Sequence, residues 1–475
     1  MSSHSSSAVG PQELRPLDRF TLQGPLKAPI PTTIMSVTKD YLETIMKANN
    51  AMDEACYLEK IECRRIGEGK GFNSHCGIFD LNYKKDGDGG EVAHSTSRNP
   101  LKIVCKVMPP FKQTVCPAFL LARFWEAEIL LVNHMSEFQG VEGEGSFKFP
   151  LCYYAAMRKD KEKKRHIGII LMQAITHIPP GNHVVPLIYR QCRAGLVNLA
   201  RFHAKFWCGD DPKNLARNNP GLKRIRSVTE RGTGVTTKYM IETGGFRDVL
   251  LMPEYAKIHS LVAMFSRKVR GIANELRKGP FTISHGDTKS DNFFFEDAKK
   301  LPDLANPETN YEALDGGDEC ITCDFQLSTI CNPCRDVVGF LILNLGSENR
   351  KLWFRQLCAV YREELSRNGV VGYSEEQMMC DFPVWLLWPL LMDIACAHQL
   401  RLFLEKFKEE TDKIKNGNTQ GQDYEAERRR YIVNQHHRER LFSALEDFEV
   451  EGVLAKLGND CRLPFFGCCC VWALK

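Results

Sequence analysis

The spacing of apolar residues changes along this chain, and this change constrains the fold more than any other feature. Before residue 173, strand-like apolar runs surround one run with helical spacing at 118–135. After residue 173, long runs with helical spacing dominate, such as 189–208 and 253–279. The strand-like runs before residue 173 cover 58–66, 75–83, 101–109, 149–157 and 166–175. The pattern predicts an α+β fold, with a small β-rich lobe followed by a larger α-helical lobe.

The chain divides at these changes of pattern. Residues 1–33 are rich in Ser and Pro, which predicts a loose N-terminal arm. We expect the small lobe over residues 34–172, beginning with a helix near Val37–Asn49, and the large lobe over 173–450. Residues 451–475 are expected to form a C-terminal tail, whose cysteine run at Cys468–Cys470 has no assigned role.

Composition excludes some classes of protein. The 475 residues carry a formal net charge of only +4, from 63 basic and 59 acidic residues, which is not typical of a nucleic-acid binder. The first residues lack the apolar core of a signal peptide, and the apolar run at 382–398 is interrupted by two prolines and Asp393. We therefore expect a buried helix there rather than a transmembrane segment, and a cytoplasmic protein whose 19 cysteines are mostly reduced.

Polar side chains with catalytic potential gather in the segment FTISHGDTKSDNFFFE, residues 281–296. Asn292 precedes one apolar strand-like run, and Asp324 follows another. If the two runs pair as a hairpin, Asn292 and Asp324 meet at one end, where their oxygens suit magnesium. Asp287 would stand nearby and accept a proton from a substrate hydroxyl.

These motifs resemble those of a known superfamily. SHGDTKSDN at 284–292 and CDFQ at 323–326 are similar to the catalytic and metal loops of the protein-kinase-like superfamily. The H-G-D form resembles the aminoglycoside phosphotransferase and choline kinase branch. LARFHAKFW at 199–207 and FPLCYYA at 149–155 narrow the resemblance, over roughly residues 35–450, to the ecdysteroid kinase-like (CHK kinase-like) family. It implies a bilobal kinase-like fold, ATP and Mg²⁺ as cofactors, and a small-molecule hydroxyl as acceptor.

The resemblance also implies nucleotide-binding residues in the small lobe. Gly67, Gly69 and Gly71 would let backbone N–H groups approach the phosphates. Lys106, inside an apolar strand, needs anionic partners, and we expect phosphate oxygens and a helix carboxylate to supply them. Glu128 is the preferred carboxylate, and Glu126 is the alternative. Lys102 competes with Lys106, although it stands at the start of the strand, where water can reach it.

Further assignments concern the hinge, Lys289, Asp336 and His203. Met172, Gln173 and Ala174 are expected at the hinge, offering backbone groups to adenine, although the family usually has an acidic residue at the position of Gln173. Lys289 is expected to stabilise charge on the transferring phosphoryl group, or else to be a solvated loop lysine. Asp336 is expected to brace the catalytic loop and begin a helix, whereas His203 is expected to pack between helices.

Two Cys-x-x-Cys pairs flank the metal loop, at Cys320/Cys323 and Cys331/Cys334. Four thiolates would suit zinc. However, Cys320 and Cys323 are three apart on a predicted strand, so their side chains point to opposite faces. Buried or loop thiols are therefore the preferred interpretation.

The sequence thus predicts a small-molecule kinase in which Asp287 and Lys289 act in catalysis and Asn292 and Asp324 hold magnesium. A protein kinase is one alternative, but no A-P-E segment follows Asp324. A non-catalytic nucleotide-binding protein is the other. The identity of the acceptor and the oligomeric state are left open.

Overall fold

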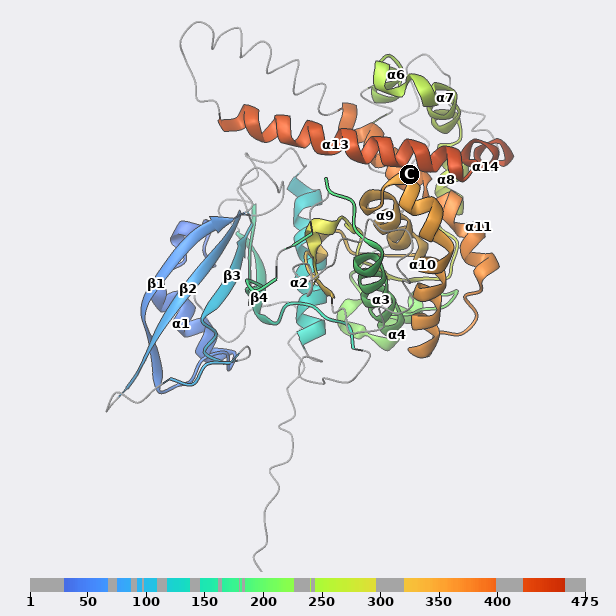
Figure 1. Ribbon diagram of the computed structural model, residues 1–475. Helices are drawn as coiled ribbons and strands as arrows, with labels where there is room; N and C mark the ends of the chain where they lie inside the picture. The colour runs from blue at the N-terminus through green and yellow to red at the C-terminus, as the bar shows by residue number, and fades with distance from the viewer. Residues whose placement is uncertain are drawn as a thin grey trace, which may run out of the picture.

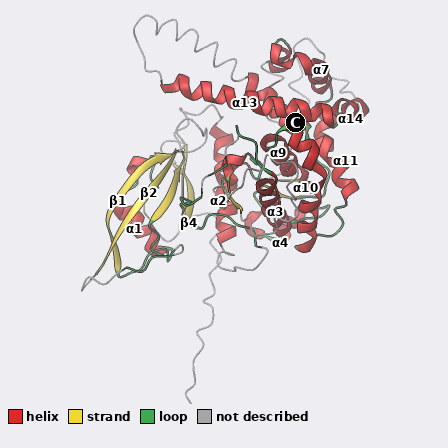
Figure 2. Cartoon of the chain, viewed as in Figure 1, coloured by secondary structure: helices red, strands yellow, loops and turns green. Residues whose placement is uncertain are grey.

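The computed structural model separates into a β-rich lobe and a helical lobe, as predicted (Figures 1 and 2). In Figure 1 the strands lie at the left and most of the helices at the right. The structure describes residues 30–66, 75–86, 92–95, 98–108, 118–136, 146–160, 165–178, 180–181, 184–225, 240, 244–295, 320–398 and 422–457.

The small lobe is built on a five-stranded antiparallel sheet. Its strand order is β1-β2-β3-β5-β4, so β5 lies between β3 and β4 although it follows β4 in the chain. The predicted strand-like runs correspond to these strands, whose bounds are β1 Cys56–Ile66, β2 His75–Lys85, β3 Lys102–Val107, β4 Cys152–Asp160 and β5 Arg165–Gln173.

One face of this sheet packs against the N-terminal helix α1 (Lys39–Ala48). Thr38 caps the helix by accepting a hydrogen bond from the Tyr41 N–H. Ile30 and Ile34 are also buried in this core. Packed structure therefore begins at least as early as Ile30, within the last four residues of the predicted N-terminal arm.

Helix α2 (Ala118–Ser136) contacts strands β4 and β5 and, beyond the sheet, the short helix η8 (Phe325–Leu327) of the large lobe. Trp125 on α2 is fully buried. A Cβ at Gly168 on β5 would lie 2.9 Å from the Trp125 ring, so glycine permits this close approach. Helix α2 thus connects the sheet to the metal loop.

The large lobe is mainly helical. Helix α3 packs on α10, and both contact α9. The described helical segments of this lobe are α3 Tyr189–Lys205, α4 Lys213–Asn218, η3 Pro220–Leu222, α6 Gly245–Leu250, η5 Pro253–Ile258, α7 His259–Arg267, α8 Val269–Glu275, α9 Cys334–Asn344, α10 Ser347–Arg367, α11 Glu375–Trp385, a segment over 387–398, α13 Gln422–Asp447 and α14 Val450–Lys456.

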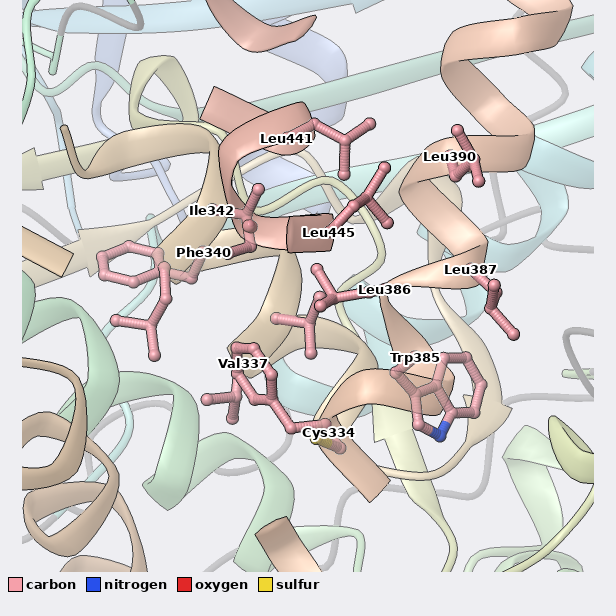
Figure 3. Close-up of a cluster of buried hydrophobic side chains, with 14 of the residues drawn as sticks. Cys334, Val337, Phe340, Ile342, Trp385, Leu386, Leu387, Leu390, Leu441 and Leu445 are labelled. Carbon is pink, nitrogen blue, oxygen red and sulfur yellow. The ribbon is translucent and has the colours of Figure 1, made fainter. Parts of the chain in front are cut away.

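The apolar run predicted to be a buried helix lies in the core of this lobe. The helical stretch Glu375–His398 is the one segment of the described chain that is long and apolar enough to cross a membrane. A turn at Leu386 interrupts it. Trp385, Leu386 and Leu390 are buried in the same cluster as residues of α9 and α13 (Figure 3). Protein contacts therefore cover much of its apolar surface.

Helix α13, which is rich in charged residues, runs along the edge of the large lobe (Figure 1). Arg438 on α13 donates to the partly buried Asp393 carboxylate at 3.2 Å and stacks on the Tyr255 ring. Val450 and Leu454 of α14 are buried in the same core, so the large lobe continues past the predicted boundary at residue 450.

Candidate active site

Two short two-stranded antiparallel sheets place the catalytic and metal loops side by side. Strand β6 (Thr282–Ser284) pairs with β9 (Thr329–Cys331), and β7 (Phe293–Phe295) pairs with β8 (Cys320–Thr322). The β7–β8 pairing is the one predicted from the sequence. Just beyond it, the Cys323 N–H donates to the Asn292 carbonyl at 2.9 Å, which brings Asp324 next to Asn292.

Asp336, at the start of α9, holds the catalytic loop. Its carboxylate accepts hydrogen bonds from the backbone N–H groups of His285 and Gly286 and from the Ser284 hydroxyl. His203 on α3 donates to it at 2.9 Å and contacts the Tyr361 hydroxyl at 2.7 Å. Both predictions for this pair agree with the structure: Asp336 braces the loop, and His203 packs between helices.

Burial alone would raise the pKa of Asp336, but the His203 hydrogen bond and the Arg335 charge lower this pKa to about 2. The Asp336 carboxylate that holds the catalytic loop is therefore ionised at neutral pH.

His285 connects the two loops through both ring nitrogens. Nδ1 accepts from the Asp287 N–H at 3.2 Å, and Nε2 lies 2.9 Å from the Cys323 carbonyl oxygen. A carbonyl cannot donate, so Nε2 carries the proton and Nδ1 is the acceptor. His285 thus holds Asp287 and the residue before Asp324 in fixed relative positions.

Lys106 is buried at the meeting point of the lobes. Its Nζ lies 2.6 Å from Glu128 Oε1 on α2 and 2.9 Å from Asp324 Oδ1. Burial would lower the pKa of Lys106, but Asp324 and Glu128 together raise it well above its usual value. Burial also raises the pKa of Glu128, against the opposing effect of Lys106. Lys106 is therefore a positive charge fixed between two carboxylates.

The structure distinguishes between the alternatives left open in the small lobe. Glu126 pairs with Arg224 rather than with Lys106. Lys102 pairs with Asp80 near the sheet surface and is about half exposed. Lys106 and Glu128 are thus the pair at the interior position, as preferred from the sequence.

Asp287 and Lys289 face one another on the catalytic loop, with 3.1 Å between Oδ2 and Nζ. Burial would raise the pKa of Asp287, but Lys289 and other neighbours hold it below its usual value. The Asn292 amide nitrogen donates to the Asp287 carbonyl at 2.8 Å, which leaves the Asn292 side-chain oxygen for a cation. The loop thus presents an ionised carboxylate, an ammonium group and an amide oxygen together.

Two backbone positions on these loops have positive φ. Gly286 has φ +86°, and a Cβ there would collide with the Leu327 carbonyl oxygen and the Arg335 guanidinium. This crowding explains glycine in the H-G-D motif. Asp324 has φ +68°, which costs on the order of 1–3 kcal/mol for a residue other than glycine. Such strain is common where a functional side chain must point in one direction.

The predicted hinge is corrected in part. Met172 lies in β5 between β3 and β4, and the Gln173 N–H already donates to the Leu151 carbonyl at 2.7 Å. The Gln173 side-chain oxygen accepts from the Leu151 N–H at 3.2 Å. The Gln173 N–H is therefore not available for adenine, and Ala174, the third predicted hinge residue, is the better candidate for that contact. The predicted phosphate-loop residues Gly67, Gly69 and Gly71 lie outside the described residues.

The cysteines around the metal loop lie on separate elements. Cys320 lies on β8 and Cys331 on β9, and both are buried, as is Cys334. Burial raises the pKa of each of these thiols and of Cys323, which disfavours thiolate. Among the residues that the structure describes, no three His, Cys, Asp or Glu side chains gather in a metal-binding group. This arrangement favours the interpretation as buried thiols over the four-thiolate zinc site.

Sequence reasoning missed two residues beside the site. Arg335 is buried, and its guanidinium donates to Ser284 Oγ at 3.0 Å, to Thr329 Oγ1 at 2.6 Å and to the Gly286 carbonyl at 3.4 Å. Gln326 donates from its amide nitrogen to Asp324 Oδ2 at 3.3 Å. The only sequence signal for Arg335 was adjacency to Asp336, whereas Gln326 is the last residue of the CDFQ motif but was given no role.

Solved structures with a similar shape are distant from this chain. A Plasmodium vivax ethanolamine kinase is 11% identical, with a TM-score of 0.39, over 82% of this chain and 83% of its own. A Streptococcus pneumoniae choline kinase is 10% identical, with a TM-score of 0.30, over 71% of this chain and 87% of its own. A search of curated proteins gave no significant match.

The family is established by sequence. The family model described as the ecdysteroid kinase-like family matches residues 89–369, which include Lys106, Glu128, the catalytic loop and the metal loop. The match covers more than half of the chain and confirms the family and the kinase class predicted from the motifs. The chain belongs to the ecdysteroid kinase-like family.

Proposed function

We propose that this protein transfers the γ-phosphoryl group of ATP to a hydroxyl of a small molecule, with magnesium as the metal. The observation that carries the proposal is the position of Lys106. One buried ammonium contacts both the α2 carboxylate Glu128 and the loop carboxylate Asp324, beside a loop that bears Asp287 and Asn292. A charged triad of this kind, joining two lobes next to a carboxylate that can accept a proton, suits phosphoryl transfer.

The donor set fits magnesium. Asp324 supplies a carboxylate and Asn292 an amide oxygen, and such oxygens are preferred by Mg²⁺, which usually binds one or two carboxylates together with substrate phosphates. Magnesium, when bound, neutralises charge on the phosphates. Lys106, held by Glu128, would bind phosphate oxygens, and Lys289 would offset negative charge near the acceptor.

Asp287 is proposed as the group that orients the acceptor hydroxyl and takes its proton. Its pKa lies below its usual value, so the carboxylate is ionised and able to accept at neutral pH. Its backbone is fixed by His285, and Lys289 contacts its side chain. Most of the rate enhancement would come from positioning and electrostatics rather than from covalent chemistry.

A small acceptor is favoured over a protein acceptor. Helix α9 begins at Cys334, soon after Asp324, and Asp336 within it is already engaged with the catalytic loop. Little chain is therefore left between the metal loop and α9 to present a protein substrate. We propose a hydroxylated metabolite as acceptor, steroid-like or choline-like, and a cytoplasmic location.

Turnover of magnesium–ATP against a metabolite extract, followed by mass spectrometry, tests this function. We expect one or more metabolites to gain the mass of a phosphate, with magnesium required and zinc chelation without effect. Asp287→Asn serves as the matched inactive control. A folded protein that neither binds ATP nor yields any phosphorylated metabolite contradicts the proposal.

A further inference from the structure

The side-chain oxygen of Gln326 is buried but accepts no hydrogen bond within the described residues. Gln326 lies two residues after Asp324, in η8. Its amide nitrogen donates to Asp324 Oδ2 at 3.3 Å, whereas within the described residues its Oε1 is buried and has no hydrogen-bond partner. An unsatisfied buried acceptor of this kind costs about 1–3 kcal/mol. Such a cost, next to a proposed metal ligand, suggests that Oε1 has a partner during function.

We propose that Gln326 is a third protein ligand of the cation, through Oε1, and that its neutrality makes cation binding depend on nucleotide. The inference rests on the proposed function, because it concerns the cation held by Asn292 and Asp324. It adds a ligand to that site and makes tight binding of the cation depend on bound nucleotide.

The geometry around Asp324 permits this role. Rotation of a carboxamide by 180° exchanges its oxygen and nitrogen without moving the rest of the side chain. After that rotation the Gln326 oxygen would stand where the nitrogen now lies, 3.3 Å from Asp324 Oδ2. Neighbouring ligands of an octahedral Mg²⁺, each about 2.1 Å from the ion, are about 3 Å apart. Two acceptor oxygens at that separation repel each other unless a cation lies between them.

The other oxygen of Asp324 is already occupied. Lys106 contacts Oδ1 at 2.9 Å, so Oδ2 is the oxygen that faces Gln326. The two oxygens of the Asp324 carboxylate thus have different partners: Oδ1 contacts Lys106, and Oδ2 faces the proposed cation position. Gln326 can exchange its amide hydrogen bond for a metal bond while the Lys106 contact is kept.

Charge explains why the nucleotide is needed. Of the three proposed ligands only Asp324 carries a charge, and the Lys106 ammonium, 2.9 Å from its Oδ1, offsets that charge. Asn292 and Gln326 add oxygens but no charge. Mg²⁺ gives up its water reluctantly and usually binds proteins together with substrate phosphates. The phosphates of a nucleotide would therefore supply the missing negative charge.

Manganese binding followed by electron paramagnetic resonance tests this inference on the full-length protein. Mn²⁺ is titrated with and without a non-hydrolysable ATP analogue. The wild-type protein should bind Mn²⁺ weakly alone and tightly with the analogue. Gln326→Leu should lower the nucleotide-dependent Mn²⁺ affinity by on the order of 10-fold. Gln326→Glu adds a charge in the same shape and should raise the nucleotide-free Mn²⁺ affinity by about 10-fold.

A matched control is available on α11. Gln377 also donates from its amide nitrogen to an aspartate, Asp381, at 2.8 Å, but on the exposed surface. Gln377→Leu should leave Mn²⁺ binding unchanged. If Gln326→Leu proves unfolded in a thermal melt, the isosteric Gln326→Glu still decides the matter.

Asp324→Asn distinguishes an error in the assignment of Gln326 from an error in the position of the metal site. If Asp324→Asn loses Mn²⁺ binding while both Gln326 variants bind like wild type, the inference about Gln326 is overturned and the proposed function stands. If Asp324→Asn also binds Mn²⁺ like wild type, the metal site itself is misplaced, and both are overturned.

Discussion

The ammonium of Lys106 lies 2.9 Å from Asp324 Oδ1, although 218 positions separate the two residues in the chain. Lys106 belongs to β3 of the small lobe, and Asp324 follows β8 of the large lobe. Glu128 on α2 contacts the same ammonium at 2.6 Å. The ion pair thus joins the two lobes, and we expect a change at any one of these three residues to alter the other two.

Removing Lys106 should weaken nucleotide binding more than removing its helix partner. Lys106→Ala leaves two carboxylates without their counter-charge, and we expect magnesium–ATP affinity to fall by on the order of 2 kcal/mol, about 30-fold. Glu128→Ala should have a smaller effect, because Glu128 acts by positioning Lys106. Isothermal titration calorimetry with magnesium measures both.

Glu126→Ala is the control for this pair. Glu126 lies on the same helix but pairs with Arg224, so its loss should leave ATP affinity within twofold or so of wild type. If Glu126→Ala is harmful and Glu128→Ala is silent, the assignment of the helix partner is wrong.

Asp336 should make the stability of the protein depend on acidity. Its folded-state pKa of about 2 lies below the usual 3.8, so its stabilising contribution is present above about pH 4 and is lost as pH falls towards 2. The shift corresponds to about 2 kcal/mol. Asp336→Asn should be less stable than wild type at pH 7, and the difference should narrow between pH 4 and 2. Urea unfolding followed across this range measures the effect.

The control for Asp336 is an exposed aspartate. Asp211 pairs with Arg217 on the surface, so Asp211→Asn should change the free energy of unfolding by less than about 1 kcal/mol at any of these pH values. A constant difference between Asp336→Asn and wild type down to pH 2 would mean that the carboxylate does not brace the loop as an anion.

Local patterns were enough to predict much of the fold and part of the site. The alternation of apolar residues indicated the strands, and the polar residues between two short apolar runs indicated the β7–β8 hairpin that joins Asn292 to Asp324. Glu126 and Glu128 are two apart on a helix and so cannot face the same neighbour. The burial of Lys106 in an apolar strand therefore required a single partner on α2, which the structure shows to be Glu128.

Contacts between distant segments could not be predicted in this way. The Gln173 N–H is engaged by Leu151, which depends on how the segment before β4 lies beside the end of β5. The positive φ of Asp324 and the buried oxygen of Gln326 depend on the packing of η8 against α2. A single sequence carries no pattern for such features, because they arise only when the lobes meet.

Lys289 should control the acidic limb of the pH–rate profile. Burial alone would raise the pKa of Asp287, and the Lys289 charge is the main opposing influence. In Lys289→Ala the pKa of Asp287 should therefore rise, so that Asp287 is protonated at higher pH and activity is lost earlier on acidification. Lys278→Ala, which removes an exposed lysine paired with Glu275, should leave the profile unchanged. A Lys289→Ala profile that coincides with wild type on the acidic side would show that Lys289 does not act on Asp287.

The roles of Asp287 and Asp324 can be separated by two conservative substitutions. Asp287→Asn keeps the size and shape of the side chain but removes the proton acceptor, so phosphoryl transfer to the acceptor should fall by on the order of 10²–10⁴. Magnesium–ATP affinity should change little, because the proposed metal ligands are Asn292 and Asp324.

Asp324→Asn should show the opposite pattern. It removes the carboxylate that Lys106 contacts and that is proposed to hold the metal, so magnesium-dependent nucleotide binding should weaken. The measurements are turnover, with the acceptor identified from the metabolite extract, and nucleotide affinity, both made on each variant. Equal losses of affinity in the two variants would place Asp287 among the metal ligands. A fully active Asp287→Asn protein would exclude Asp287 as the proton acceptor and, with it, the assignment of this segment as the catalytic loop.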